Sequence, residues 1–140
     1  MIDTDKAKKL FARDRYAALA GVEILEAGNG YCRACMTIDD RHLNAANVVQ
    51  GGAIFTLADL AFAVAANSHG QLALSVNVHI SYLNSVSAGT LYAEASEVGK
   101  PGRLGVYDVV VSDDRDRIVA KFSGMVYRKN TRVEIGQHVP

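Results

Sequence analysis

One apolar run, "AIFTLADLAFAVAANSHG" at residues 53–70, constrains the fold of this chain more than any other segment. It follows Gly51-Gly52, is rich in Ala and Leu, and ends at Gly70, which predicts a helix over about residues 53–67. The run is apolar on nearly all sides, and a helix with that pattern is buried rather than lying on the surface. The other segments must therefore fold around it.

A single carboxylate, Asp59, lies in the middle of this run. Buried carboxylates are rare, and those that occur are often paired or functional. Two interpretations follow from the residues alone. Either Asp59 serves a site that faces away from the core, or it bonds a nearby hydroxyl or backbone N–H group and orders the helix.

The segments around the predicted helix indicate an antiparallel sheet. Two strands precede it, "GVEILEA" and "YCRACMTID", joined by a Gly28-Asn29-Gly30 turn that suits a hairpin. Four β-branched or aromatic segments with turn residues between them follow it: "LALSVNVHISYL", "TLYAEASEV", "LGVYDVVVSD" and "RIVAKFSGMVYRK". We therefore predict an α+β fold, a single domain over residues 1–140 in which one antiparallel sheet wraps around the central helix, the hot-dog arrangement.

A shorter amphipathic helix is expected over residues 4–19, with Ala7, Leu10, Phe11, Ala18 and Leu19 mostly on its apolar face. The opening residues carry scattered charges rather than the pattern of a signal peptide, and no apolar run is long enough to span a membrane. Fifteen basic residues balance fifteen acidic ones, so no global field attracts nucleic acid or an anionic membrane. We expect a cytoplasmic protein.

Cys32 and Cys35 form a lone CxxC, which raises the question of a metal or redox site. Residues three apart on a strand point to opposite faces, no second CxxC is present, and the four His residues are scattered at positions 42, 69, 79 and 138. Reduced, half-buried thiols are the better interpretation, with no metal and no cofactor.

Several motifs resemble those of the PaaI-type hot-dog thioesterases over roughly residues 20–128. Members of that family commonly have Asn, five residues, His-Gly-Gly, and an acidic residue nine positions after the His. The matching residues here are Asn44, Gln50-Gly51-Gly52, Phe55, Leu57, Ala58-Asp59, "SYL" at 81–83 and "GVYD" at 105–108. The chain departs from the family at Gln50, where His is usual, and at Asn47, where Gly is frequent.

The resemblance implies hydrolysis of an acyl-CoA thioester. Asp59 would act as nucleophile or general base, and the Gly51 N–H would donate to the carbonyl oxygen, since helix starts have free N–H groups. Gln50 would position the carbonyl without carrying a proton. Asn44 would hold the loop and Ser75 would orient water, although an Asx turn and an ordinary strand hydroxyl are equally open for these two.

The resemblance also implies how substrate is bound and how the chain assembles. Gly52, Phe55, Leu60 and Phe62 would meet the acyl group, which we expect to be aryl or phenylacetyl, with short or medium chains possible. Surface cations would contact the phosphates of coenzyme A, and the candidates are Lys100, Arg103, Arg128 and Lys129. Family members build each site from two subunits, so we expect a homotetramer, a dimer of dimers.

Two other functions stay open at this stage. A hydratase or dehydratase would need a His beside its acidic residue, and His42 and His79 lie outside that spacing. A hot-dog domain that binds an acyl-CoA without turnover is consistent with Gln50. Nucleotide and metal sites have no motif in their favour.

Overall fold

A computed structural model of the chain describes residues 1–134 and 136. Its helices are α1 (Thr4–Phe11), α2 (Arg15–Ala20), the 3-10 turn η1 (Asp40–His42) and α3 (Gly51–Asn67). Its strands are β1 (Val22–Gly28), β2 (Tyr31–Thr37), β3 (Gln71–Tyr82), β4 (Thr90–Val98), β5 (Leu104–Ser112) and β6 (Ile118–Arg132). The predicted α+β class is confirmed.

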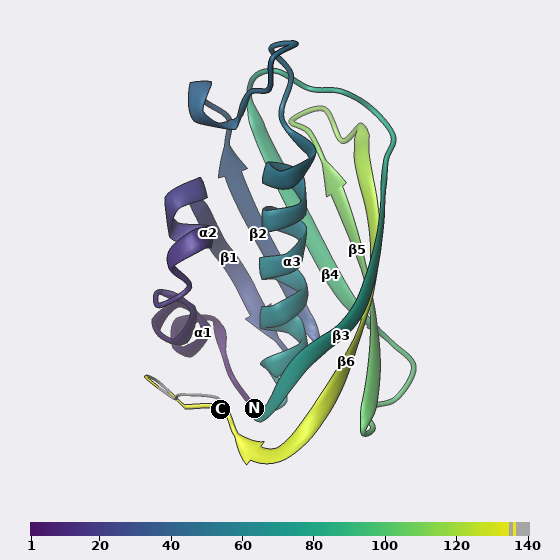
Figure 1. The fold of residues 1–140 in the computed structure, drawn as a ribbon. Helices are drawn as coiled ribbons and strands as arrows, with labels where there is room; N and C mark the ends of the chain where they lie inside the picture. Colours follow the sequence, from purple (N-terminus) through teal and green to yellow (C-terminus); the bar gives the residue numbers. More distant parts are fainter. Residues whose placement is uncertain (135, 137–140) are drawn as a thin grey trace.

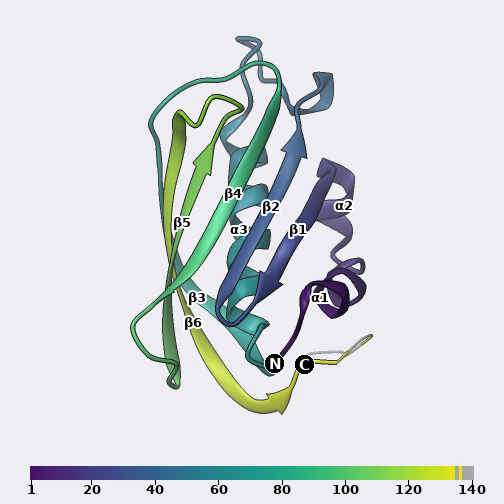
Figure 2. The same ribbon diagram turned by 180° about the vertical axis from the view of Figure 1, so that it is seen from behind.

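One antiparallel sheet curves around α3, as Figure 1 shows from the helix side and Figure 2 from behind. The strand order is β1-β2-β4-β5-β6-β3, so β1 and β3 are the two edges. The helices α1 and α2 lie beside α3 on the β1 side, and β3 borders the opposite flank. This is the predicted hot-dog arrangement, with the central helix enclosed on the sheet side and open on the other.

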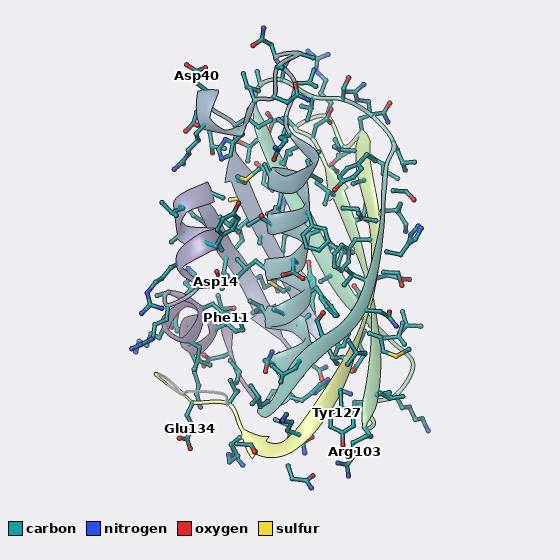
Figure 3. The ribbon with its side chains drawn as sticks, viewed as in Figure 1. Phe11, Asp14, Asp40, Arg103, Tyr127 and Glu134 are labelled. Carbon is teal, nitrogen blue, oxygen red and sulfur yellow. The ribbon has the colours of Figure 1, made fainter. Side chains whose placement is uncertain are left out.

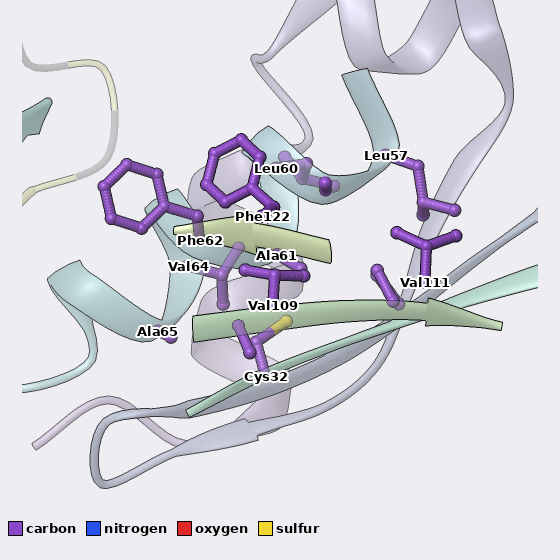
Figure 4. Packing of buried hydrophobic residues seen from close by; sticks show 14 of the residues in the cluster. Cys32, Leu57, Leu60, Ala61, Phe62, Val64, Ala65, Val109, Val111 and Phe122 are labelled. Atoms are coloured by element: carbon purple, nitrogen blue, oxygen red, sulfur yellow. The ribbon is translucent and has the colours of Figure 1, made fainter. Parts of the chain in front are cut away.

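The core forms between α3 and the concave face of the sheet. Figure 4 shows Leu57 and Phe62 of α3 packed near Val109, Val111 and Phe122 from the strands. The Phe62 side chain is 1% exposed, and its ring centroid lies 5.4 Å from that of Phe122. A buried aromatic pair at this distance adds about 0.5 to 1.5 kcal/mol beyond area burial. The C-terminal half of α3 is thereby held against the sheet.

The N-terminal segment corrects one prediction, because residues 4–19 form two helices rather than one. Asp14 caps the second helix, its carboxylate accepting the Ala17 N–H at 3.0 Å. An Asp side chain that bonds the backbone favours a helix start over a helix interior. The restart shifts the helical phase, so Ala17 is buried while Leu19, predicted to face the core, is 70% exposed.

The first hairpin has the predicted turn, with positive φ at Asn29 and Gly30. Cys32 points into the core and Cys35 to the opposite face of β2, and both thiols are free. Burial raises the pKa of the Cys32 thiol to about 12.

In the described part of the chain, no group of three His, Cys, Asp or Glu side chains is arranged to hold a metal ion, and no helix is long and apolar enough to cross a membrane. The cytoplasmic location stays a prediction.

A buried polar network lies beyond the C-terminal end of α3. Glu97 Oε2 accepts hydrogen bonds from Arg128 and from the Tyr107 hydroxyl, each at 2.7 Å, and Glu97 Oε1 lies 3.0 Å from His69 Nε2. Arg128 is 3% exposed and also donates to the Gly102 carbonyl. The prediction that Arg128 is a surface cation is therefore wrong, since its guanidinium is committed inside the protein.

The "GVYD" motif has its explanation in the same network. A Cβ at Gly105 would lie 2.7 Å from Arg128 Nη1, so this glycine leaves space for the guanidinium. Tyr107 is fully buried, and its hydroxyl oxygen accepts a hydrogen bond from Arg128 Nη2 at 2.6 Å. This motif stabilises the sheet and does not belong to the site described below.

Candidate active site

The loop that leads into α3 is held by its own side chains. The Asn44 Oδ1 atom accepts the N–H groups of Ala46 at 2.9 Å and Val48 at 3.3 Å. Asn47 has φ 60°, the left-handed conformation that Asn tolerates. Asn44 thus holds the loop through an Asx turn, and it does not touch the glycines that follow.

His42 anchors this loop to the N-terminal helices. Its Nδ1 atom accepts the Asp39 N–H at 3.0 Å, so the ring carries its proton on Nε2, which donates to the Ala20 carbonyl at 2.6 Å. The His42 carbonyl in turn accepts the Gln50 N–H at 2.8 Å. Both ring nitrogens are occupied, which makes His42 a structural anchor rather than an acid or base.

The N-terminus of α3 offers two free donors. The Gln50 carbonyl accepts from Ala53 and Ile54, and Gln50 gives no side-chain cap. The N–H groups of Gly51 and Gly52 have no acceptor among residues 1–134 and 136. Free N–H groups at the positive end of a 17-residue helix favour a developing negative charge. This is the geometry that an oxyanion requires.

Two side chains frame these donors. The Tyr82 hydroxyl, at the end of β3, donates to the Gly51 carbonyl at 3.0 Å. The Gln50 amide oxygen would lie 2.7 Å from a Cβ at Gly52, so the amide covers that glycine. The Gln50 amide therefore lies beside the two donors, and its role toward substrate stays a prediction.

We expect side chains at Gly51 to lower activity in proportion to their size. A Cβ there would lie 3.0 Å from the Tyr82 ring, which is half exposed and can turn aside, so the fold should tolerate the change. Gly51→Ala should reduce kcat/KM for a thioester roughly tenfold and Gly51→Val on the order of a hundredfold, because the methyl groups obstruct approach to the N–H. Equal melting temperatures with unchanged kcat/KM in both variants would remove Gly51 from the site.

Asp59 lies further along the same helix. Its half-buried side chain is on the α3 face turned away from the sheet, with Gly52, Thr56 and Ala63 at helical spacing around it. Burial, and next the negative charge of Asp14, raise the pKa of the Asp59 carboxyl above its ordinary value. Eight residues separate it from Gly51, a rise of about 12 Å. One carbonyl group therefore cannot contact both within a single chain.

The remaining predicted residues divide into three placements. Ser75 is exposed on the edge strand β3, seven residues and so about 23 Å along the strand from Tyr82, whose hydroxyl contacts Gly51. Phe55 is half-buried, and its ring centroid lies 5.7 Å from that of Phe122. Phe62 fills the core, which does not support its predicted acyl contact.

Lys100 and Arg103 lie at the end of the sheet opposite the start of α3 (Figures 1 and 3). Both are exposed, and the Arg103 guanidinium lies 5.7 Å from the ring centroid of Tyr127 and donates to its hydroxyl at 3.3 Å. They are too distant to meet a ligand bound at Gly51 of the same chain.

Three contributors were missed by the sequence reasoning. His42 and Tyr82 hold the donors of α3, and Asp14 lies close enough to influence Asp59. Tyr82 stands in the "SYL" motif, but that motif does not show its bond to Gly51, 31 residues away. Nothing in the local pattern distinguished His42 or Asp14, because their roles depend on contacts between separate elements.

The fold and the site together define a hot-dog thioesterase. The model of the thioesterase superfamily matches residues 46–120, which include α3 and the strands β3, β4 and β5. The acyl-coenzyme A thioesterase PaaI of Escherichia coli is 32% identical over 87% of this chain and 88% of its own length. A protein of Archaeoglobus fulgidus with a provisional esterase assignment is 43% identical over 86% of this chain and 79% of its own. The chain belongs to the thioesterase superfamily.

Solved structures agree with this assignment. The E. coli PaaI structure superposes with a TM-score of 0.86 at 29% identity, covering 94% of this chain and 99% of that one. A Streptococcus mutans protein, solved with acetyl-CoA bound, superposes with a TM-score of 0.75 at 26% identity, covering 79% and 90%. The resemblance noted in the sequence is confirmed.

Proposed function

We propose that this protein hydrolyses acyl-CoA thioesters at sites shared between two copies of the chain. The observation that carries the proposal is the separation, about 12 Å along one helix, between free N–H donors at Gly51 and a carboxylate at Asp59. Each is half of a thioester-hydrolysing site. A second copy must supply the other half.

The edge strand β3 offers the means of assembly. It is unpaired on one side and exposes Leu74 and Val76, a combination that proteins normally cover. A two-fold axis that pairs β3 with β3 of a second copy runs the strands antiparallel and reverses the ends of the molecule. The start of one α3 then meets the middle of the other, and Lys100 and Arg103 move to the end where coenzyme A phosphates would lie. Two such dimers would form the expected tetramer.

In this site each group has a defined task. The Gly51 N–H stabilises negative charge on the carbonyl oxygen, and Asp59 of the second copy attacks the carbonyl carbon or removes a proton from water. The raised pKa of the Asp59 carboxyl makes it a stronger base than an exposed Asp. Gln50 and Tyr82 hold the donor loop. Support for coenzyme A comes from the related S. mutans protein bound to acetyl-CoA, and for a phenylacetyl group from PaaI, which belongs to a phenylacetic acid degradation operon.

One observation favours a second function, binding without turnover. Gln50 stands where the family usually has His, and an amide cannot carry a proton. A hydratase or dehydratase is less favoured, because both ring nitrogens of His42 are occupied by backbone groups. Free-thiol release from benzoyl, phenylacetyl, acetyl and octanoyl-CoA decides between these functions. Release above background supports the hydrolase, and tight binding without release supports the second function.

A mixing experiment tests the shared site. Gly51→Val and Asp59→Asn chains are each expected to be nearly inactive, but a dimer of one with the other contains one intact site. Random pairing of equal amounts should then restore about a quarter of wild-type activity. Light scattering gives the oligomeric state of each sample. The shared site is refuted if the mixture stays as inactive as its components although subunit exchange has been demonstrated. Gly51 and Asp59 would then not complete a site across two chains.

A further inference from the structure

Two adjacent side chains, Arg41 and His42, tie the loop before α3 to the end of α2. Arg41 Nη1 donates to the Leu19 carbonyl and His42 Nε2 donates to the Ala20 carbonyl, both at 2.6 Å. The last carbonyls of a helix have no partner within it, and basic side chains there interact favourably with its dipole. Figure 3 shows the preceding residue, Asp40, above the end of α2. We call Arg41 and His42 the α2 clamp.

Neighbouring residues are shaped around the α2 clamp. A Cβ at Gly21, where φ is 79°, would lie 2.5 Å from Arg41 Nη2, so this glycine leaves room for the guanidinium. The Asp39 carboxylate lies 3.2 Å from Arg41 Nε, and the Asp39 N–H donates to His42 Nδ1. The His42 side chain is 2% exposed. The two basic groups are therefore held in the orientation that faces α2.

The α2 clamp reaches the donors of α3 through one further hydrogen bond. The His42 carbonyl accepts the Gln50 N–H at 2.8 Å, and Gln50 immediately precedes Gly51. An open space of about 400 Å³ lies between α2 and the start of α3, and Arg41, His42, Gln50 and Gly52 all border it. Only His42 and Gln50 thus connect the end of α2 to the Gly51 N–H along this path.

The rate of a reaction that forms an oxyanion depends on where the donors lie. The N–H groups must lie about 2.7 to 3.1 Å from the oxygen that gains charge, and a misplacement of about 1 Å can cost on the order of a hundredfold in rate. Building on the proposed function, we infer that Arg41 and His42 are positioning residues, which place the Gly51 N–H by holding its loop against α2. The short helix α2 then has a role in catalysis, as the fixed element from which the donor is placed.

Two substitutions of His42 separate positioning from stability. Asn can place an oxygen near the position of Nδ1 and keep the bond from Asp39, whereas Gln can place an N–H group near the position of Nε2 and keep the bond to Ala20. Each variant loses one buried hydrogen bond, so both should melt at similar, lower temperatures. Only His42→Asn loses the tether to α2, and its kcat for thioester hydrolysis should fall roughly tenfold, with KM changed less than about twofold. His42→Gln should keep more than about half of the wild-type kcat.

Arg41 gives an independent test at a side chain that is 51% exposed, so the fold should tolerate its replacement. Arg41→Met keeps the apolar stem but loses the donor to the Leu19 carbonyl, and kcat should fall about threefold to fivefold. Arg41→Lys keeps an N–H donor and should recover most of that loss. Arg15→Met, at the exposed first residue of α2, is the matched control and should change neither kcat nor KM.

Nuclear magnetic resonance separates this inference from the proposed function. The backbone amide signals of Gly51 and Gly52 should differ between His42→Asn and His42→Gln, which both lack the imidazole ring, and should stay at their wild-type positions in Arg15→Met. This comparison needs no substrate, so absence of thiol release from every acyl-CoA would refute the hydrolase and leave the comparison valid. His42→Asn and His42→Gln proteins with the same kcat, or with the same Gly51 amide signal, overturn the positioning role.

Discussion

Asp59→Asn is expected to lower kcat for thioester hydrolysis by at least about a hundredfold, since an amide can neither attack the carbonyl carbon nor take a proton from water. The substitution keeps the size of the side chain, so binding and assembly should persist. Thiol-release assays, with light scattering on the same samples, measure both effects. Asp108→Asn, at an exposed position on β5, is the control and should retain full activity.

The same substitution should not weaken the fold, which distinguishes a functional Asp59 from a structural one. The raised pKa means that folded protein holds the proton more tightly than unfolded protein does. The associated stability is fully present below about pH 3.9, the unfolded value, and is lost as the pH rises through the folded pKa. Asp59→Asn should therefore melt at or above the wild-type temperature at pH 7, with the difference closing toward pH 4. A large destabilisation at pH 7 would assign Asp59 to helix packing.

The second large effect is structural: Arg128→Met should destabilise the protein by about 3 to 5 kcal/mol, because it leaves the largely buried Glu97 carboxylate, 11% exposed, without its cation. For a chain of this size the melting temperature should fall by roughly 10 to 20 °C. Lys121→Met, at an exposed position of the same strand, is the matched control and should change stability little. Urea titration gives the free energy of unfolding of both variants.

The partner substitution refines this prediction. Burial alone would raise the pKa of Glu97, but hydrogen bonds from Tyr107 and His69, with the charges of His69 and Arg128, outweigh it and lower the pKa. Ionised Glu97 therefore stabilises the fold above about pH 4.3, its unfolded value, and that contribution is lost as the pH falls through the lower folded pKa. Adding Glu97→Gln to Arg128→Met should restore part of the lost stability at pH 7. A cost below about 1 kcal/mol for Arg128→Met would show that the network is not needed.

The strands could be predicted from the sequence because their limits are set locally. Gly28-Asn29-Gly30 and the other turn residues end each strand whatever the rest of the chain does. The N-terminal helix was predicted incorrectly for the opposite reason. Apolar spacing suggested one helix, but the Asp14 cap competes with the helix interior, and a cap is seen only once the backbone is placed.

The burial of Arg128 could have been predicted from the alternation of residues along β6. The inward positions of β6 alternate through Phe122, Gly124 and Val126, and the same period places Arg128 inside. The prediction of Gly51 and Asp59 as site residues rests on a spacing that lies within one segment. Tyr82 and Asp14 act across distances of 31 and 45 residues, which local patterns do not report.

The 12 Å between Gly51 and Asp59 also has a kinetic consequence. If neither half can turn over a thioester alone, a solitary chain is silent, and specific activity must rise with protein concentration until pairing is complete. Dilution would then act as an off switch that needs no inhibitor. Newly made chains would hydrolyse no thioester until their concentration was high enough for pairing.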